Sequence, residues 1–138
     1  MFDCQQALLN HLKSEFKAPQ INTIAGYAGE LKDATKLTEI VPAVLVIYID
    51  GEPAAQDRFH NFDLLVITES RTLQIKENLE GNLKLVTDVT KFLRQKPLFV
   101  SFDGVYYSDP EKLTGRTLSI DNRYTIVALS LFIDDRTP

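Results

Sequence analysis

Cysteine, histidine and tryptophan are scarce in this chain of 138 residues, which has one cysteine, two histidines and no tryptophan. The single cysteine, Cys4, cannot form an internal disulfide, which is typical of a protein from a reducing compartment. Cys4 also has no evident base or basic niche that would activate a thiolate. The histidines, His11 and His60, have no cysteine or glutamate at metal-ligand spacing. We therefore expect no metal site, no cysteine nucleophile and no cofactor.

Long apolar runs, phosphate-binding glycine loops and a strong net charge are also missing. The longest apolar run, residues 42–49, is far shorter than the ~20 residues needed to cross a bilayer, and the first residues do not have the pattern of a signal peptide. No Rossmann or P-loop glycine motif is present. The net charge is −4, whereas broad binding to nucleic acid needs a basic stripe. We expect neither a membrane nor a nucleic acid among the partners.

What the chain has is a series of apolar, β-branched runs. With 44% hydrophobic and 25% charged residues, it is typical of one globular domain over residues 1–138. Residues 42–49, 58–68 and 117–133 read as strands, the last with an interruption at residues 121–122. We expect the first two to pair antiparallel. The more consistently apolar face of the second strand is predicted to point to the core: His60, Phe62, Leu64, Val66 and Thr68.

Helical spacing marks three other segments. The first helix is predicted to start at an Asp3 N-cap and to bury Ala7 or Leu8, Leu12 and Phe16. Residues 30–40 read as a short helix. A third is predicted over residues 82–95, with Leu83, Val86, Val89 or Thr90, and Leu93 on one stripe. The conformation of residues 73–80 stays open, because Gly81 would cost a continuous helix about 1 kcal/mol.

Turn signals complete the interpretation. Asp103–Gly104 between apolar stretches indicates a hairpin turn or a bulge, and a polar loop follows over residues 109–115. The tail, residues 134–138, is expected to fray. The fold class is therefore α+β, with a mainly antiparallel sheet flanked by helices. Core positions are predicted at Val44, Val46, Leu64, Val66, Leu83, Val86 and Leu129.

One weak catalytic pattern is present. Asp63 on a strand, followed by Gln74 and Lys76, is similar to the acid and Gln-x-Lys arrangement of metal-dependent nucleases. Such sites need the acid and the lysine on adjacent strands around one Mg²⁺, and here the lysine lies in a loop or at a helix start. Solvated surface residues are the favoured interpretation, so we expect no enzyme activity.

Two loops carry mixed charge, residues 50–58 and 109–116. Each contains acids and a base, and solvated turns are the ordinary explanation. Loops between long strands are also natural contact elements. The functional interpretation is that these two loops contact a neighbouring subunit.

The overall order of elements, with GYAGELKD at residues 26–33 and PAVLV at residues 42–46, resembles a known family. It is similar to small proteins encoded in the tail-morphogenesis region of Mu-like phages and prophages, which are similar in fold to tail terminators, also called tail-completion proteins. The resemblance covers most of the chain and implies a tail-terminator-like fold. No catalytic or cofactor residue carries over, because that family has none.

The resemblance implies a structural protein of the virion tail, present in the bacterial host cytoplasm during assembly. Tail terminators form rings, usually hexameric, that cap the tail tube, so the implied partners are other copies of the chain, the tube protein and the neck or connector proteins. On that basis Arg58 and Arg116 are candidates to pair with Glu52 or Glu111 of a neighbouring subunit. Two alternatives stay open: a small cytoplasmic ligand-binding or regulatory module, and a divergent nuclease built on Asp63.

Overall fold

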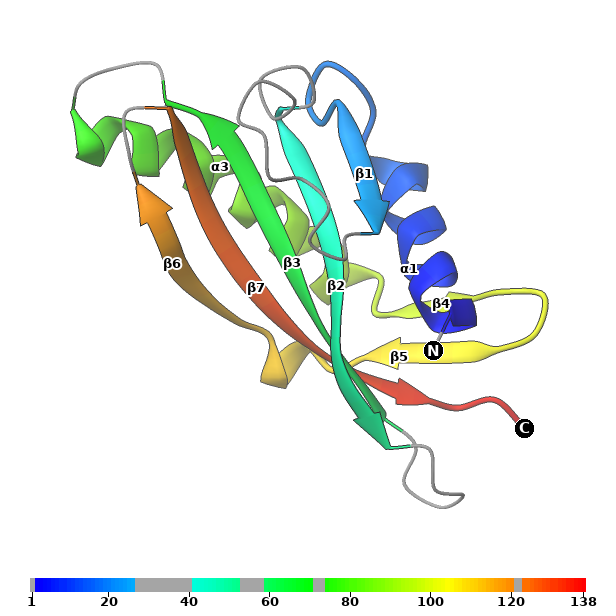
Figure 1. Cartoon of the computed structure of the whole chain (residues 1–138). Helices are drawn as coiled ribbons and strands as arrows, with labels where there is room; N and C mark the ends of the chain where they lie inside the picture. Colours follow the sequence, from blue (N-terminus) through cyan, green and yellow to red (C-terminus); the bar gives the residue numbers. More distant parts are fainter. Residues whose placement is uncertain (1, 27–40, 53–58, 71–73, 121–122) are drawn as a thin grey trace.

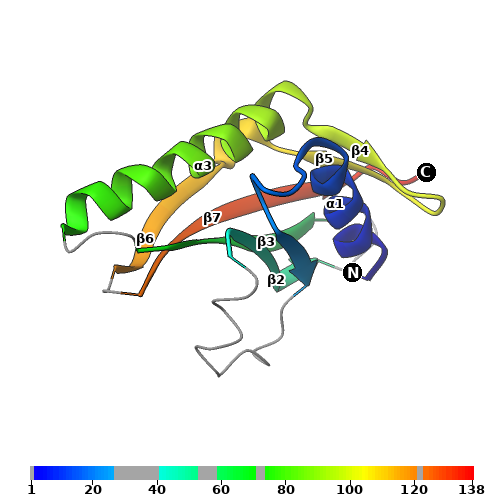
Figure 2. The same cartoon turned by 90° about the horizontal axis from the view of Figure 1, so that it is seen from above.

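The computed structural model describes residues 2–26, 41–52, 59–70, 74–120 and 123–138. Within these ranges the chain forms a sheet with two helices on one of its faces (Figures 1 and 2). The elements follow the chain in this order: α1 (Phe2–Glu15), β1 (Thr23–Gly26), β2 (Ala43–Glu52), β3 (Phe59–Glu69), α3 (Ile75–Gln95), β4 (Leu98–Val100), β5 (Val105–Ser108), the 3₁₀ turn η1 (Pro110–Lys112), β6 (Thr114–Ile120) and β7 (Tyr124–Asp135).

The sheet has the strand order β1-β2-β3-β7-β5-β4, and β6 also pairs with β7. Among the described strands only the β1–β2 pair is parallel, and the other pairs are antiparallel. Residues 125–130 of β7 pair with β6, and residues 133–135 pair with β5. The prediction of an α+β fold with a mainly antiparallel sheet is confirmed, as is the antiparallel pairing of the two strands around residues 42–68.

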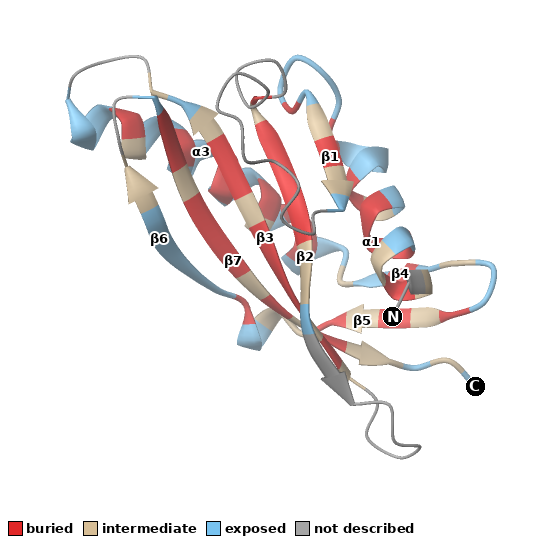
Figure 3. Cartoon of the chain, viewed as in Figure 1, coloured by how far each residue is buried: buried red, intermediate tan, exposed pale blue. Residues whose placement is uncertain are grey.

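The main core lies between the sheet and the two helices. The predicted inward face of β3 is confirmed, because Phe62, Leu64 and Val66 are buried in the same cluster as Leu8, Leu12 and Phe16 of the first helix and its end. Val44, Val46, Val86 and Leu129 are buried there too, as predicted. Strict alternation along β2, β3 and β7 leaves a second, smaller cluster on the other face: Val41, Ala43, Leu45, Ile67 and Tyr124. Figure 3 shows buried positions along these three strands and an exposed β6.

The long helix α3 differs from the prediction in its length and in its buried face. It begins at Ile75 and runs through Gly81, so the segment left open, residues 73–80, is helical from Ile75 onward. A Cβ added at Gly81 would meet nothing within 4 Å, so glycine there weakens the helix without breaking it. The prediction that Leu83 lies in the core is wrong, because this residue is 39% exposed. Asn82 takes the inward position instead and is fully buried.

Both ends of the chain also differ from the prediction. Asp3 was predicted as the N-cap of the first helix, but the helix includes Phe2 and Asp3 lies in its first turn. The tail does not start to fray at residue 134, because β7 continues to Asp135 and the Arg136 N–H donates to the Val105 carbonyl at 2.8 Å.

Strand β6 begins at Thr114, inside the predicted loop. The helix predicted for residues 30–40 and the interruption at 121–122 lie outside the described residues.

Candidate interaction surfaces

Three of the four predicted interface residues, Glu52, Glu111 and Arg116, belong to elements that the structure describes. Glu111 is exposed in η1, where its backbone N–H is capped by the Asp109 side chain at 3.0 Å. Arg116 lies on β6, so it belongs to a strand and not to the predicted loop. Glu52 is the last residue of β2, and its side chain lies outside the described part. The whole of Arg58 lies outside it too. Contact of these residues with a second subunit stays a prediction.

Arg116 has a partner within its own chain. Its Nη2 lies 3.1 Å from Oδ2 of Asp63 on β3, and its Nη1 lies 3.3 Å from Oγ of Ser130 on β7. The Ser130 hydroxyl donates to the other Asp63 oxygen at 3.0 Å. Asp63 is nearly buried, whereas 58% of the Arg116 side chain is exposed. Arg116 therefore neutralises a carboxylate of the sheet and keeps part of its guanidinium at the surface.

The same geometry bears on the nuclease alternative. Asp63 is engaged by Arg116 and Ser130, whereas Gln74 and Lys76 lie at the start of α3 and not on an adjacent strand. The structure therefore does not bring the acid and the lysine together in the arrangement such a site needs. In the described ranges no group of three or more His, Cys, Asp or Glu side chains is placed to hold a metal ion.

An apolar edge is formed by β4 and the turn that follows it, and sequence reasoning missed it. Leu98 and Val100 point outward on this terminal strand, at 52% and 64% exposure, while Phe99 between them is buried. Phe102 in the turn is fully exposed. We call Leu98, Val100 and Phe102 the β4 edge. The available signal was that both faces of this strand are apolar. When such a strand lies at the edge of a sheet, one apolar face stays exposed and can contact another surface.

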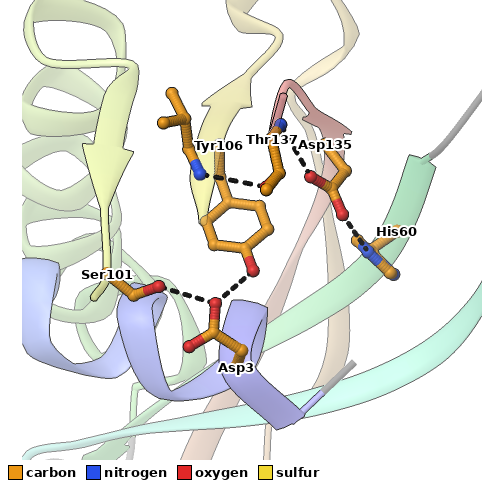
Figure 4. A network of polar contacts seen from close by, with 7 residues as sticks. Asp3, His60, Ser101, Tyr106, Asp135 and Thr137 are labelled. Carbon is orange, nitrogen blue, oxygen red and sulfur yellow. Dashed lines mark hydrogen bonds and ion pairs between the residues drawn. The ribbon is translucent and has the colours of Figure 1, made fainter. Parts of the chain in front are cut away.

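A polar network holds the β4–β5 hairpin in place (Figure 4). The Asp3 carboxylate of α1 accepts hydrogen bonds from the Ser101 hydroxyl at 2.6 Å and from the Tyr106 hydroxyl. These two hydrogen bonds hold the pKa of Asp3 below its ordinary value, and burial together with Asp3 raises the pKa of Tyr106. The Thr137 hydroxyl accepts from the Val105 N–H at 3.1 Å. The hairpin is therefore tied to the first helix and to the C-terminal residues.

His60 and Asp135 extend this network across β3 and β7. The His60 Nε2 lies 3.6 Å from Asp135 Oδ2, and Asp135 Oδ1 accepts from the Thr137 N–H at 3.0 Å. Burial lowers the pKa of His60, with the carboxylate opposing the shift only in part. Burial of Asp135 disfavours its charge, but hydrogen bonds from Thr137 and His60 outweigh that effect and lower its pKa. At neutral pH the pair is a neutral imidazole beside a carboxylate, which suits a structural contact.

The remaining reactive side chains have environments that suppress reactivity. Burial raises the pKa of the Cys4 thiol to about 12, so the thiolate is scarcely populated at neutral pH. His11 Nε2 lies 2.8 Å from the Lys96 carbonyl oxygen and its ring stacks on Phe99, and burial lowers its pKa. The carboxylates of Asp3 and Asp135 near Cys4 also raise the pKa of its thiol and so disfavour the thiolate.

Two further features bear on the surface. Lys112 lies over the ring of Phe132 at 4.0 Å, and that ring stacks on Phe59 at 5.1 Å. Arg136 lies over Tyr107 at 4.0 Å. These cation–aromatic contacts cover rings that would otherwise add to the exposed apolar surface. None of the described helices is long and apolar enough to cross a membrane.

Comparison with known proteins shows the fold and little more. No family model matches the sequence, and no curated protein matches it either. A solved structure whose name states no function has a TM-score of 0.61 at 9% identity, covering 99% of this chain and 93% of its own. A chain from the virion of a native gene transfer agent particle has a TM-score of 0.48 at 12% identity, covering 97% and 94%. At these identities the first likeness shows a shared fold, and the second is too low to carry an argument.

Proposed function

We propose that this protein is a structural component of a phage or prophage tail, a tail-completion protein that forms a ring on the tail tube and contacts the neck. The short sequence motifs at residues 26–33 and 42–46, which resemble the Mu-like tail family, support this proposal. The observation that carries the proposal is the β4 edge: Leu98, Val100 and Phe102 are exposed on a hairpin that a polar network holds in place.

The partner of the β4 edge is a second copy of the chain. In the described part of the sheet three strands have a free edge, β1, β4 and β6, and β1 and β4 differ in sequence and in burial. A contact in which β4 of one copy meets the β1 end of the next is heterologous. Contacts of that kind close into a ring when the rotation between copies divides a full turn. Pairing of Arg58 and Arg116 with Glu52 or Glu111 of the neighbour would set the geometry at the rim of this contact.

We also propose that the protein has no catalytic activity, since Asp63, Cys4 and His11 are each engaged or suppressed by their surroundings. Nuclease, phosphatase and esterase assays of the purified protein should be blank. An activity that copurifies with the wild type and disappears in Asp63→Ala would contradict this.

The test of the tail function is genetic. Deletion of the gene in a host that produces the particles should yield tails of uncontrolled length or without heads in electron micrographs. The wild-type gene should restore them, and Phe102→Asp should not, because a charge on the apolar edge blocks docking. Glu15→Gln, a change at an exposed residue of α1 away from the edge, is the matched control and should restore assembly. Normal tails in the deletion strain would refute the proposal.

A further inference from the structure

Strand β4 lies at one end of the described sheet and pairs only with β5 (Figure 1). Hydrogen bonds link two antiparallel strands at every second position. The bonds that frame β4 run from the Ser108 N–H to the Pro97 carbonyl at 2.8 Å and from the Ser101 N–H to the Gly104 carbonyl at 2.9 Å. Phe99 is the bonded position between them. The N–H and C=O groups of Leu98 and Val100 therefore point away from β5, to the free edge.

This free edge is poorly protected against pairing with another strand. Natural edges are commonly blocked by charged side chains or by bulges. Strand β6 has both protections, because it carries Arg116 and its register shifts between Thr117 and Ser119. Strand β4 has neither, and its only protection is its length of three residues. Its backbone therefore remains open to another strand through a short contact.

The charges beside β4 indicate which strand fits it. Lys96 precedes the strand and Asp103 lies in the turn that follows it, and both residues are exposed. Neither takes part in an ion pair among the described residues. Two antiparallel copies of β4 would bring the basic end of each strand to the acidic end of the other. Strand β1, with the sequence TIAG, has no charged residue to match them. The charge pattern therefore favours a second β4 as the occupant of this edge.

We propose that the free protein forms a twofold dimer in which β4 of each copy pairs antiparallel with β4 of the other. With Phe99 at the twofold axis, Leu98 of one copy faces Val100 of the second copy, and the reverse pair repeats the contact. The outward N–H and C=O groups of these residues then bond to one another. Their apolar side chains, exposed in the single chain, lie side by side across the junction. Lys96 meets Asp103 of the second copy at both ends of the contact.

The dimer concerns the protein before assembly and so goes beyond the proposed tail function. The ring contact proposed above uses the same β4 edge, so one copy cannot make both contacts at once. The dimer covers Leu98 and Val100 in the free protein, and its copies must separate before a ring forms. A contact built on a three-residue strand is small and therefore weak, which allows that separation.

Sedimentation velocity of the purified chain tests the dimer over a dilution series from about 1 mM to about 10 µM, the range in which small interfaces dissociate. The wild type should pass from dimer to monomer within this series. Lys96→Glu and Asp103→Lys should each weaken the dimer at least about fivefold, because each variant places like charges together at both ends of the contact. An equimolar mixture of the two variants should associate nearly as tightly as the wild type, since every pair in the mixed dimer again has opposite charges.

Two further variants separate the edge from the rest of the surface. Lys84→Glu is the matched control, since it makes the same charge change at an exposed residue of α3 outside the edge, and it should leave the Kd within about twofold. Val100→Pro removes an N–H from the free edge and no bond to β5, so it should leave only monomer, with circular dichroism as the check of folding.

Three results would overturn the dimer. They are a wild type that is monomeric at every concentration, a dimer that neither charge variant weakens, and a mixture of these variants that associates no more tightly than either alone. Species larger than a dimer would also overturn it, while supporting the heterologous ring contact. Tails of normal length in the deletion strain would refute the tail function and leave the dimer unaffected, so the two proposals fail separately.

Discussion

Replacement of Leu93 by alanine should lower the free energy of unfolding by about 2–5 kcal/mol. Leu93 is 1% exposed in the core between α3 and the sheet, so truncation both loses buried apolar area and leaves a cavity. The matched change is Leu83→Ala, ten residues earlier on the same helix and 39% exposed. Water refills the space at Leu83, and alanine is the better helix former. We therefore expect Leu83→Ala to cost less than about 1 kcal/mol.

Urea unfolding followed by far-ultraviolet circular dichroism separates the two outcomes. With a slope of about 2 kcal/mol per molar urea, Leu93→Ala should lower the midpoint by about 1 M or more. Leu83→Ala should lower it by less than about half of that. Equal losses in both variants, with unchanged slopes, would mean that α3 packs with a different face. The assignment of Asn82 to the buried side would then be wrong as well.

Three other changes test separate parts of the structure. Gly81→Ala should stabilise the protein by about 0.5–1 kcal/mol, since the new methyl meets no atom within 4 Å; a loss of stability in urea unfolding would contradict the open surface there. Tyr106→Phe should cost about 1.5–3 kcal/mol, because Asp3 loses a hydrogen bond to its carboxylate; an unchanged midpoint would remove the network from the list of stabilising contacts. Stability should fall as the pH drops below about 6.5, because the unfolded chain then binds protons that folded His60 and His11, with their lowered pKa values, do not. His60→Gln should reduce that fall between pH 6.5 and 5, above the range in which Asp135 titrates, and an unchanged slope would refute the role of His60.

The strands could be predicted from their apolar, β-branched runs, and the core face of β3 from simple alternation. Phe62, Leu64 and Val66 repeat with period two, and that pattern alone places them on the core side of β3. The face of α3 could not be predicted in the same way. Its inward stripe contains Asn78 and Asn82, two polar residues that a hydrophobic pattern assigns to solvent. Asn82 is buried because carbonyl groups of β3 and β7 accept its N–H groups, and those partners are known only once the strands are in place.

The environment of Arg116 escaped prediction for a related reason. Its partner Asp63 lies 53 positions earlier in the sequence, and the two meet only because β7 separates β6 from β3 by a single strand. The sequence places Arg116 in a mixed-charge loop next to Glu111, which suggests a contact with another subunit. In the fold the guanidinium reaches across Ser130 to a carboxylate of its own sheet. The part of Arg116 that stays exposed is what a neighbouring subunit can contact.

The β4 edge depends on position in the sheet, which no local pattern contains. Leu98, Phe99 and Val100 are all apolar, as in a strand covered on both faces, yet β4 is the last strand and two of the three are exposed. A flexible hairpin with this composition would be a poor docking surface, because ordering it on binding costs entropy. Here the tail that was expected to fray secures the hairpin through Arg136 and Thr137, and α1 secures it through Asp3. The residues that keep the edge ordered are thus far from it in sequence, so changes at Asp3 or Thr137 should weaken the proposed assembly although the residues of the edge stay the same.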